Sequence, residues 1–238
     1  MITYTIQSII AVLKAKGYAL FEDDSKNYNL NLIGVRSNGA TPNSFDDLMI
    51  VIWKHQGEWN MRAFPITTDP GTYWLEHPIQ ELGAAIVKEG QYRGLWQKAL
   101  HQGKYAALCQ RKPITVIRDF NKDNRLDFET PDLTGLRVAT TEAGGETLRE
   151  YFEEDHLVWR ESSGLYGINC HRASENGHSI NVDKWSAGCQ VLQNREIINP
   201  DNQAVKVFEF DYFMHLVDQA IANWGNSFTY TLINENDF

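Results

Sequence analysis

The chain has 238 residues, and its composition excludes several classes of protein. With 42% hydrophobic and 22% charged residues it is typical of a soluble globular protein, which excludes a disordered or fibrous chain. The formal net charge of −9 argues against a nucleic acid as partner, because phosphate binding needs clustered Lys and Arg. Three cysteines are too few for a disulfide framework, so we expect at least one free thiol.

The first predicted element is a short amphipathic helix. Apolar residues follow helical spacing from Ile6 to Leu13, and the pattern stops at Gly17. The start of the chain has no basic segment before a long apolar core, and no apolar run approaches the roughly 20 residues of a membrane span. We therefore expect a protein made as a soluble cytoplasmic chain, without a signal peptide or a membrane span.

The middle of the chain is predicted to form β-strands joined by short turns. Strands are expected at 30–36 and 48–53, the second apolar enough to be buried on both faces, before a hairpin turn at 56–58. Further strand-like segments lie at 59–65, 84–87, 106–110, 114–118, 157–159 and 165–171. The pattern predicts a mainly antiparallel β body. Residues 132–150, which contain several glycines, are expected to form a loop or a flexible joint.

The C-terminal part predicts a longer helix and a last strand. An apolar stripe at helical spacing runs from Phe210 to Trp224 and ends at Gly225, and a strand follows at 228–233. No internal repeat or clear domain boundary is visible. We therefore expect one mainly β (α+β) unit over residues 1–238 with short N- and C-terminal helices, and the sequence leaves its oligomeric state open.

The residues most suited to catalysis lie between 165 and 195. His171 ends a predicted strand, and Cys189 follows a turn of small residues before another strand. A thiol beside an imidazole is a ready nucleophile, with His171 as the base. Gly188 lets a substrate carbonyl approach the backbone, so the Gly188 and Cys189 N–H groups are candidates for an oxyanion hole. The alternative is a buried, inert Cys189 beside a solvated His171.

This spacing resembles the signature of the L,D-transpeptidase (YkuD-type) catalytic domain, which is a histidine, a gap of 14 to 17 residues and then Ser/Thr-x-Gly-Cys. Here 14 residues separate His171 from Ser186-Ala187-Gly188-Cys189. The resemblance implies a β-rich catalytic fold, a cysteine acyl-enzyme and a peptidoglycan stem peptide or muropeptide as substrate. It assigns Cys189 as nucleophile, His171 as base, Gly188 to the oxyanion hole and Ser186 to hydrogen bonds within the turn. The implied core is most evident at 105–235, with a possible N-terminal subregion at 1–100.

Three residues depart from the family pattern. Arg172 stands where a glycine is common, Ala187 where a second histidine is frequent, and Gln190 where an apolar residue is usual. We expect these changes to alter the substrate contacts while leaving acyl transfer intact. The predicted substrate-binding residues are Arg172, Gln190, Trp185 and Tyr166.

The sequence leaves the acceptor of the acyl group open. Water as acceptor would make the protein an endo- or carboxypeptidase of the lysis type, and an amine would make it a transpeptidase. The absence of an export signal favours hydrolysis, as in a phage lysis protein or a delivered effector. The expected site of action is then the cell wall, reached by one of those routes or by non-classical export.

A second motif suggests a metal. Oxygen-bearing side chains alternate as in the first part of a calcium loop at Asp119, Asn121, Asp123 and Asp127. Position 12 of that loop is Thr130 and not the usual glutamate, so we expect at most a weak structural calcium site or a plain Asx-rich turn. No cofactor is required. A zinc site at Cys170, His171, His178 and Cys189 is disfavoured, because neighbours in a strand point to opposite faces. A Cys170–Cys189 redox pair, which would silence the nucleophile, is an equally disfavoured alternative.

Two other functions remain open. Acidic runs such as 153–155 would suit a cell-wall glycan hydrolase. The chain would otherwise be a non-catalytic wall-binding module or a phage structural component. Aromatic residues at 73–74, 92 and 96 are expected either to line a binding groove or to fill the core.

Overall fold

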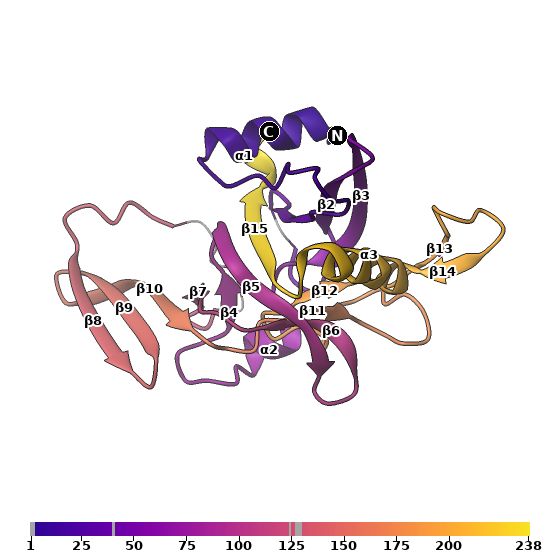
Figure 1. Cartoon of the computed structure of the whole chain (residues 1–238). Helices are drawn as coiled ribbons and strands as arrows, with labels where there is room; N and C mark the ends of the chain where they lie inside the picture. Colours follow the sequence, from indigo (N-terminus) through magenta and orange to yellow (C-terminus); the bar gives the residue numbers. More distant parts are fainter. Residues whose placement is uncertain (1–2, 40, 124, 127–129) are drawn as a thin grey trace.

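The computed structural model describes residues 3–39, 41–123, 125–126 and 130–238. Its main feature is a closed barrel of eight strands in the order β1-β15-β5-β6-β11-β12-β3-β2 (Figure 1). Their bounds are β1 Asn31–Arg36, β2 Asp47–His55, β3 Glu58–Thr67, β5 Gly90–His101, β6 Tyr105–Gln110, β11 Cys170–Arg172, β12 Gln190–Leu192 and β15 Phe228–Asn234. Neighbouring strands are antiparallel, except that β1 pairs with β15 and β11 with β12 in parallel. The prediction of a mainly β fold is confirmed.

A second sheet lies beside the barrel, on the left in Figure 1. Its order is β4-β7-β10-β9-β8, with β4 Ala85–Val87, β7 Ile114–Arg118, β8 Arg137–Ala143, β9 Glu146–Glu153 and β10 His156–Gly164. A smaller hairpin, β13 Glu196–Ile198 with β14 Lys206–Phe208, projects on the other side. The expectation of a loop at 132–150 is wrong, because Gly144 and Gly145, with φ of 61° and 83°, form the tight turn between β8 and β9.

The barrel wall is buried on both faces where α1, Ile6–Ala15, covers it. Leu32 and Met49 face the barrel interior, whereas their neighbours Ile33 and Ile50 pack against α1, as the period of two in a strand requires. Thr5 begins the helix through a capping box with Ser8. The helix was predicted, as was the burial of 48–53 on both faces, and both predictions are confirmed.

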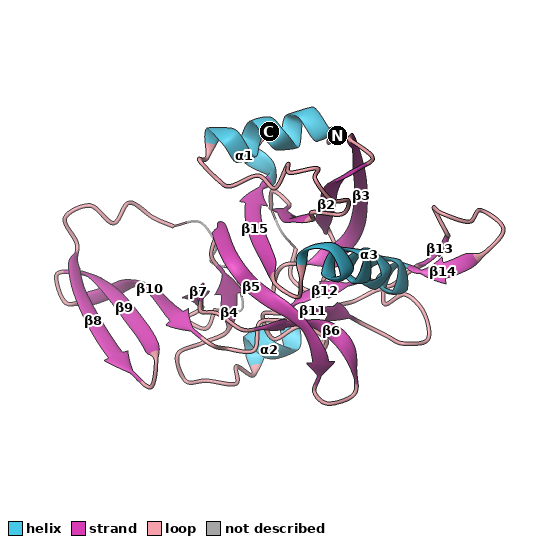
Figure 2. Ribbon diagram, viewed as in Figure 1, coloured by secondary structure: helices cyan, strands magenta, loops and turns pink. Residues whose placement is uncertain are grey.

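The C-terminal helix α3, Glu209–Trp224, places its apolar stripe on the barrel core, as predicted. Phe213 is fully buried and meets Phe64 of β3 edge to face, with ring centroids 5.6 Å apart. The short helices α2, Thr72–Glu76, and η1, Glu235–Asp237, complete the described elements. Figure 2 shows α1 and α3 on separate sides of the strands.

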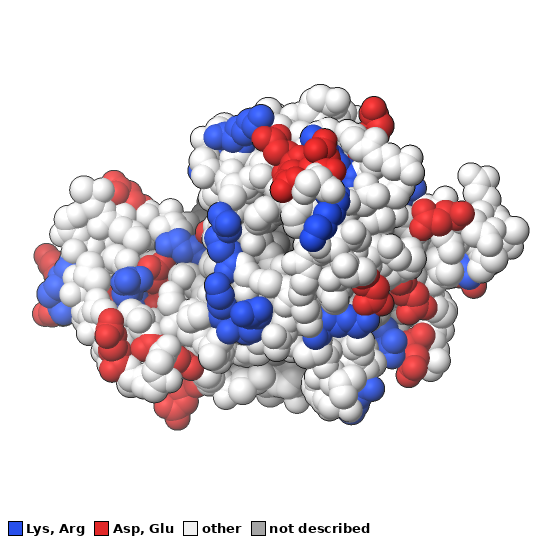
Figure 3. All heavy atoms as spheres, in the orientation of Figure 1, with Lys and Arg blue, Asp and Glu red and all other residues white. Residues whose placement is uncertain are grey.

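Other sequence predictions were only partly correct. The twelve-residue strand β5 was missed. Of the strand expected at 165–171 only residues 170 and 171 form, as part of β11. Within the described residues, no helix is both long and apolar enough to cross a membrane. On the face shown in Figure 3, acidic and basic side chains are interspersed, and a short line of basic side chains crosses the centre over β5.

Candidate active site

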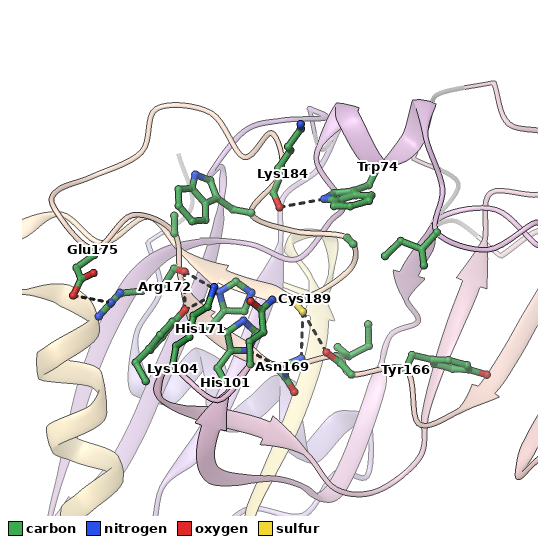
Figure 4. Close-up of a pocket in the computed structure, with 18 residues that line it drawn as sticks. Trp74, His101, Lys104, Tyr166, Asn169, His171, Arg172, Glu175, Lys184 and Cys189 are labelled. Atoms are coloured by element: carbon green, nitrogen blue, oxygen red, sulfur yellow. Dashed lines mark hydrogen bonds and ion pairs between the residues drawn. The ribbon is translucent and has the colours of Figure 1, made fainter.

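A cavity of about 870 Å³ brings together most of the residues predicted to be catalytic or substrate-binding. Cys189, His171, Arg172, Trp185 and Tyr166 all line it (Figure 4). Other parts of its wall come from the end of β5, the start of β6 and helix α2. The cavity therefore joins segments that are more than 100 residues apart in the sequence.

The parallel pairing of β11 and β12 sets the direction in which each residue points. Cys170 lies opposite Gln190, and His171 lies opposite Val191. Because neighbours alternate, Cys170 is fully buried in the barrel core while His171 lines the cavity. All three cysteines, Cys109, Cys170 and Cys189, are free thiols.

The turn that precedes Cys189 is held by its own side chain. Ser186 is fully buried; its Oγ donates to the Cys189 carbonyl at 2.8 Å and accepts from the Gly188 N–H at 3.1 Å. Gly188 has a φ of +124°, and a Cβ there would lie 2.6 Å from the carbonyl oxygen of Ala85 in β4. The turn is thus fixed, and the Gly188 N–H, predicted for the oxyanion hole, is engaged within it.

Helix α2 anchors the loop that leads into this turn. The Gly71 N–H donates to the Ser186 carbonyl at 2.9 Å, and the Trp74 indole N–H donates to the Lys184 carbonyl at 3.2 Å. A Cβ at Gly71 would fall 2.0 Å from the Asp183 carbonyl oxygen, so the two backbones touch. This contact keeps Cys189 at a defined place in the cavity wall.

Cys189 is held as a neutral thiol. The residue as a whole is partly exposed, and Sγ donates to the Gly167 carbonyl at 3.4 Å and accepts from the Asn169 N–H at 3.4 Å. Burial of the sulfur is the main cause that raises the pKa of Cys189 to about 11. At neutral pH, reaction therefore needs a base that removes the thiol proton.

His171 lines the same cavity, and one nitrogen of its neutral ring is free to accept a proton. Its Nδ1 lies 2.8 Å from the Arg172 carbonyl oxygen, which can only accept, so Nδ1 carries the proton and Nε2 keeps its lone pair. Burial lowers the pKa of His171 to about 4, with a smaller lowering from His101, so the ring is neutral at pH 7. His171 and Cys189, both of which the structure describes, are not hydrogen-bonded to each other. The Cys189 thiol donates instead to the Gly167 carbonyl.

Three members of this site, His101, Asn169 and Tyr105, were not predicted from the sequence. The His101 and His171 rings stack with centroids 4.3 Å apart, and the Asn169 side chain contacts His101 (Figure 4). The Tyr105 hydroxyl lies 3.5 Å from His171 Nδ1 and donates to the Arg172 carbonyl at 3.4 Å. His101 ends β5, 70 residues before His171, and only the pairing of distant strands brings the two together.

The predicted substrate-binding residues divide into two groups. Arg172, Trp185 and Tyr166 line the cavity; Arg172 pairs with Glu175 at 3.3 Å, and its guanidinium lies 4.2 Å from the Tyr105 ring centroid. Gln190, by contrast, is fully buried on the side of β12 that faces away from the cavity.

The prediction that Gln190 contacts substrate is wrong for this structure. The residue after the cysteine turn begins β12 and faces the barrel interior. There it accepts a hydrogen bond from the Tyr230 hydroxyl at 2.5 Å and donates to the Thr68 carbonyl at 3.4 Å. Its role is to hold β12 against the core.

The predicted calcium loop is described only in part. Asp119 is fully buried and accepts from the Lys122 N–H at 3.0 Å, while Asn121 and Asp123 bond to each other. Asp127 lies outside the described residues. Within the described ranges, no group of three or more His, Cys, Asp or Glu side chains is placed to hold a metal ion.

Other residues singled out in the sequence lie elsewhere. Residues 153–155 are the last residue of β9 and the turn into β10, in the second sheet, and do not line the cavity. Trp96 is fully buried and donates to the Ile168 carbonyl at 2.8 Å, which makes it a core residue. Trp74, by contrast, lies on the cavity wall.

Comparison with known proteins adds no family to this geometry. No protein-family model matches the chain, and neither a curated protein nor a solved structure gives a match. The functional argument therefore rests on the motif and on the cavity that contains it.

Proposed function

We propose that this protein is a cysteine-dependent acyl-transfer enzyme that acts on peptidoglycan stem peptides. One observation carries the proposal: a partly exposed Cys189 and a neutral His171 with an open Nε2 lie in the wall of the same large cavity. The resemblance of residues 165–195 to the L,D-transpeptidase signature supports the substrate class. The cell wall is then the site of action.

In the first half-reaction, Cys189 Sγ attacks the carbonyl carbon of a peptide bond. The S–C bond forms as His171 Nε2 takes the thiol proton, which gives a tetrahedral intermediate and an imidazolium. The C–N bond then breaks, and the leaving amine takes that proton from His171. A thioester on Cys189 and a neutral His171 remain.

In the second half-reaction, His171 removes a proton from the acceptor as it attacks the thioester. Water gives a carboxylic acid, and an amine gives a new amide; in both cases the proton returns to the Cys189 sulfur. Since the two acceptors share the first half-reaction, the same residues serve a peptidase and a transpeptidase. The fixed Ser186 turn keeps the sulfur in place through both steps.

The charges around the cavity suit an acidic peptide. Lys104, Arg172 and Lys184 line it together with one acid, Glu175, although the whole chain has a net charge of −9. Stem peptides carry several carboxylates, and cations in a cleft attract them. The exposed Trp185 and the half-buried Trp74 add apolar surface for the aliphatic parts of such a peptide.

Mass analysis of digested cell-wall sacculi tests the proposal. We expect the protein to release or exchange stem-peptide residues, and both Cys189→Ala and His171→Ala to abolish these products. Cys109→Ala is the matched control, because this half-buried thiol does not line the cavity, and it should keep full activity.

Two results would overturn the proposal. Cleavage of the glycan strands that survives in Cys189→Ala would indicate a hydrolase that uses acids. Sacculi that bind the protein but keep their composition would indicate a non-catalytic wall-binding module.

A further inference from the structure

The cavity wall contains two histidines where the sequence motif predicts one. His101 is buried, stacks on His171 at a centroid distance of 4.3 Å and an interplanar angle of 22°, and lines the same cavity as Cys189. The His101 ring is not part of the His171–Cys189 motif, and the first step proposed above does not use it. The hydrogen bonds around the His101 ring determine which of its nitrogens can donate and which can accept.

The tautomer of His101 follows from the hydrogen bonds of Asn169. Asn169 Oδ1 accepts from the backbone N–H of Gln110 at 2.8 Å, which settles the orientation of the amide. Asn169 Nδ2 therefore faces His101 Nδ1 at 3.1 Å and donates to it. Because Nδ1 accepts, neutral His101 carries its proton on Nε2.

The two stacked rings are therefore held in opposite tautomers. His171 has its proton on Nδ1, directed at the Arg172 carbonyl, and an acceptor at Nε2. His101 has an acceptor at Nδ1 and its proton on Nε2. Among the described residues, neither Nε2 has a hydrogen-bond partner, and neither is among the polar atoms sealed from solvent. The cavity thus contains one ring nitrogen that is free to accept a proton, on His171, and one ring N–H that is free to donate a hydrogen bond, on His101.

An additional donor is what the cysteine turn lacks. A tetrahedral intermediate is stabilised by N–H groups directed at its oxyanion, and such sites commonly use two. The Gly188 N–H already donates to Ser186 Oγ at 3.1 Å, which leaves the Cys189 N–H on this turn. Asn169 links Cys189 to His101, since its backbone N–H donates to Sγ and its side chain to the ring.

We propose that His101 is a second catalytic histidine, whose Nε2–H donates to the carbonyl oxygen that becomes the oxyanion, and that Asn169 is its positioning residue. This inference rests on the proposed acyl transfer. The hydrogen bond strengthens as charge develops on the oxygen, and no proton is transferred from His101. Ala187, at the position where the related motif has its second histidine, lines the same cavity and supplies no side-chain donor.

Histidine tautomers are observable without any activity. Long-range ¹H–¹⁵N correlation spectra of the ¹⁵N-labelled protein at pH 7 should show His171 protonated on Nδ1 and His101 on Nε2. Asn169→Asp should move the His101 proton to Nδ1, because both carboxylate oxygens accept. Asn176→Asp is the matched control on an exposed loop and should change neither ring. A His101 that is protonated on Nδ1 in the wild-type protein would overturn the proposal.

Two probes of Cys189 separate the oxyanion from the activation of the thiol. A 4-nitrophenyl ester of N-acetyl-alanine forms an oxyanion but needs no proton for its leaving group, whereas a 2-pyridyl disulfide reacts at sulfur without an oxyanion. In His101→Phe, which keeps a stacked ring, we expect acylation by the ester to fall about 100-fold and the disulfide reaction to change less than about 3-fold. His101→Gln keeps an acceptor for Asn169 and a donor, so it should recover most of the acylation rate.

The controls distinguish failure of this inference from failure of the proposed function. His178→Phe, an exposed histidine outside the cavity, should leave both rates unchanged. His171→Ala should slow both probes; if it slows neither, the acyl-transfer proposal itself fails. If His171→Ala slows both and His101→Phe slows neither, or slows both equally, the oxyanion role of His101 is overturned while the acyl transfer stands.

Discussion

The barrel interior and the cavity both bury titratable side chains, on opposite sides of β12, and they differ in how those groups are satisfied. In the barrel, the Thr68 N–H and hydroxyl both lie 2.7 Å from one carboxylate oxygen of Asp47. The Arg36 Nε donates to Thr68 Oγ1 at 3.0 Å and lies 3.1 Å from Asp69. Gln190 joins this network through the Thr68 carbonyl.

In the cavity, each histidine ring has one nitrogen fixed by the protein and one left open. His171 is fixed through the Arg172 carbonyl and His101 through Asn169. A satisfied network stabilises the fold, whereas an oriented but unsatisfied atom is available to a substrate. Burial alone therefore does not mark a functional group; in the cavity, the ring nitrogens that substrate can reach are those without a protein partner among the described residues.

The largest effect is expected from removing the cation of the barrel network. Arg36→Met leaves Asp47 and Asp69 buried without their shared guanidinium, and we expect the free energy of unfolding to fall by about 3–5 kcal/mol. Urea denaturation measures the change. Lys54→Met, which removes the cation of an exposed pair with Asp24, should cost less than about 1 kcal/mol. Equal losses in the two variants would mean that the barrel network contributes no more than a surface pair.

The two regions should also respond to pH with opposite signs. Burial, with a smaller contribution from Asp69, raises the pKa of Asp47 to about 7, so its contribution to stability is present below the unfolded value near 4 and is lost as pH rises to 7. The pKa of His171 is lowered to about 4, so its contribution is present above 6.5 and is lost as pH falls to 4.

Unfolding measured between pH 4 and 7 checks these signs. Each group changes the slope by at most about 1.4 kcal/mol per pH unit. His171→Phe should make stability fall more steeply as pH rises, and Asp47→Leu should make it fall less steeply or rise. If both variants shift the slope in the same direction, the contrast between the regions is wrong.

A smaller effect is expected at the turn between the two regions. Gly188→Ala combines a φ of +124° with a Cβ 2.6 Å from the Ala85 carbonyl, and we expect a loss of about 1–3 kcal/mol and slower acylation of Cys189. Gly177→Ala is the matched control, since its φ is +146° with no atom within 4 Å of the added Cβ. The difference between the two variants isolates the contact with β4, and its absence would show that the turn relaxes freely.

The smallest effect on stability is expected at the rim of the cavity. Glu175 is largely exposed, so Glu175→Ala should change the free energy of unfolding by less than about 1 kcal/mol. If the proposed stem peptide is the substrate, Arg172 freed from this pair should bind one of its carboxylates more strongly and lower KM about 2-fold to 3-fold with kcat unchanged. Arg172→Ala should raise KM. A change in kcat alone would place Arg172 outside substrate binding.

The sequence predicted the strands and helices that have strong apolar patterns. The runs that became β1 and β2 are apolar on both faces because α1 covers the outer one, and the stripe of α3 is continuous. Strand β5 and the β8–β9 hairpin were missed because their residues are largely half-exposed or exposed, and without a buried face the period of two is weak.

The site was predictable where its residues are close in sequence. The His171 and Cys189 spacing follows from two adjacent strands, β11 and β12, joined by one loop. His101 was not predictable, since only the pairing of β6 with both β5 and β11 brings its ring to His171. Gln190 was wrongly predicted to bind substrate because it directly follows Cys189. Its place in the sequence does not reveal whether its side chain faces the cavity or the barrel interior.

The parallel pairing of β1 with β15 has a consequence for how the protein is made. Residues 37–227 lie between these strands, so at about 5–20 residues per second β15 leaves the ribosome roughly 10–40 s after β1. Until then β1 and β5 each present an unpaired edge, which is a template for association with other chains. The barrel that positions His101, His171 and Cys189 can therefore close only after β15 has been synthesised.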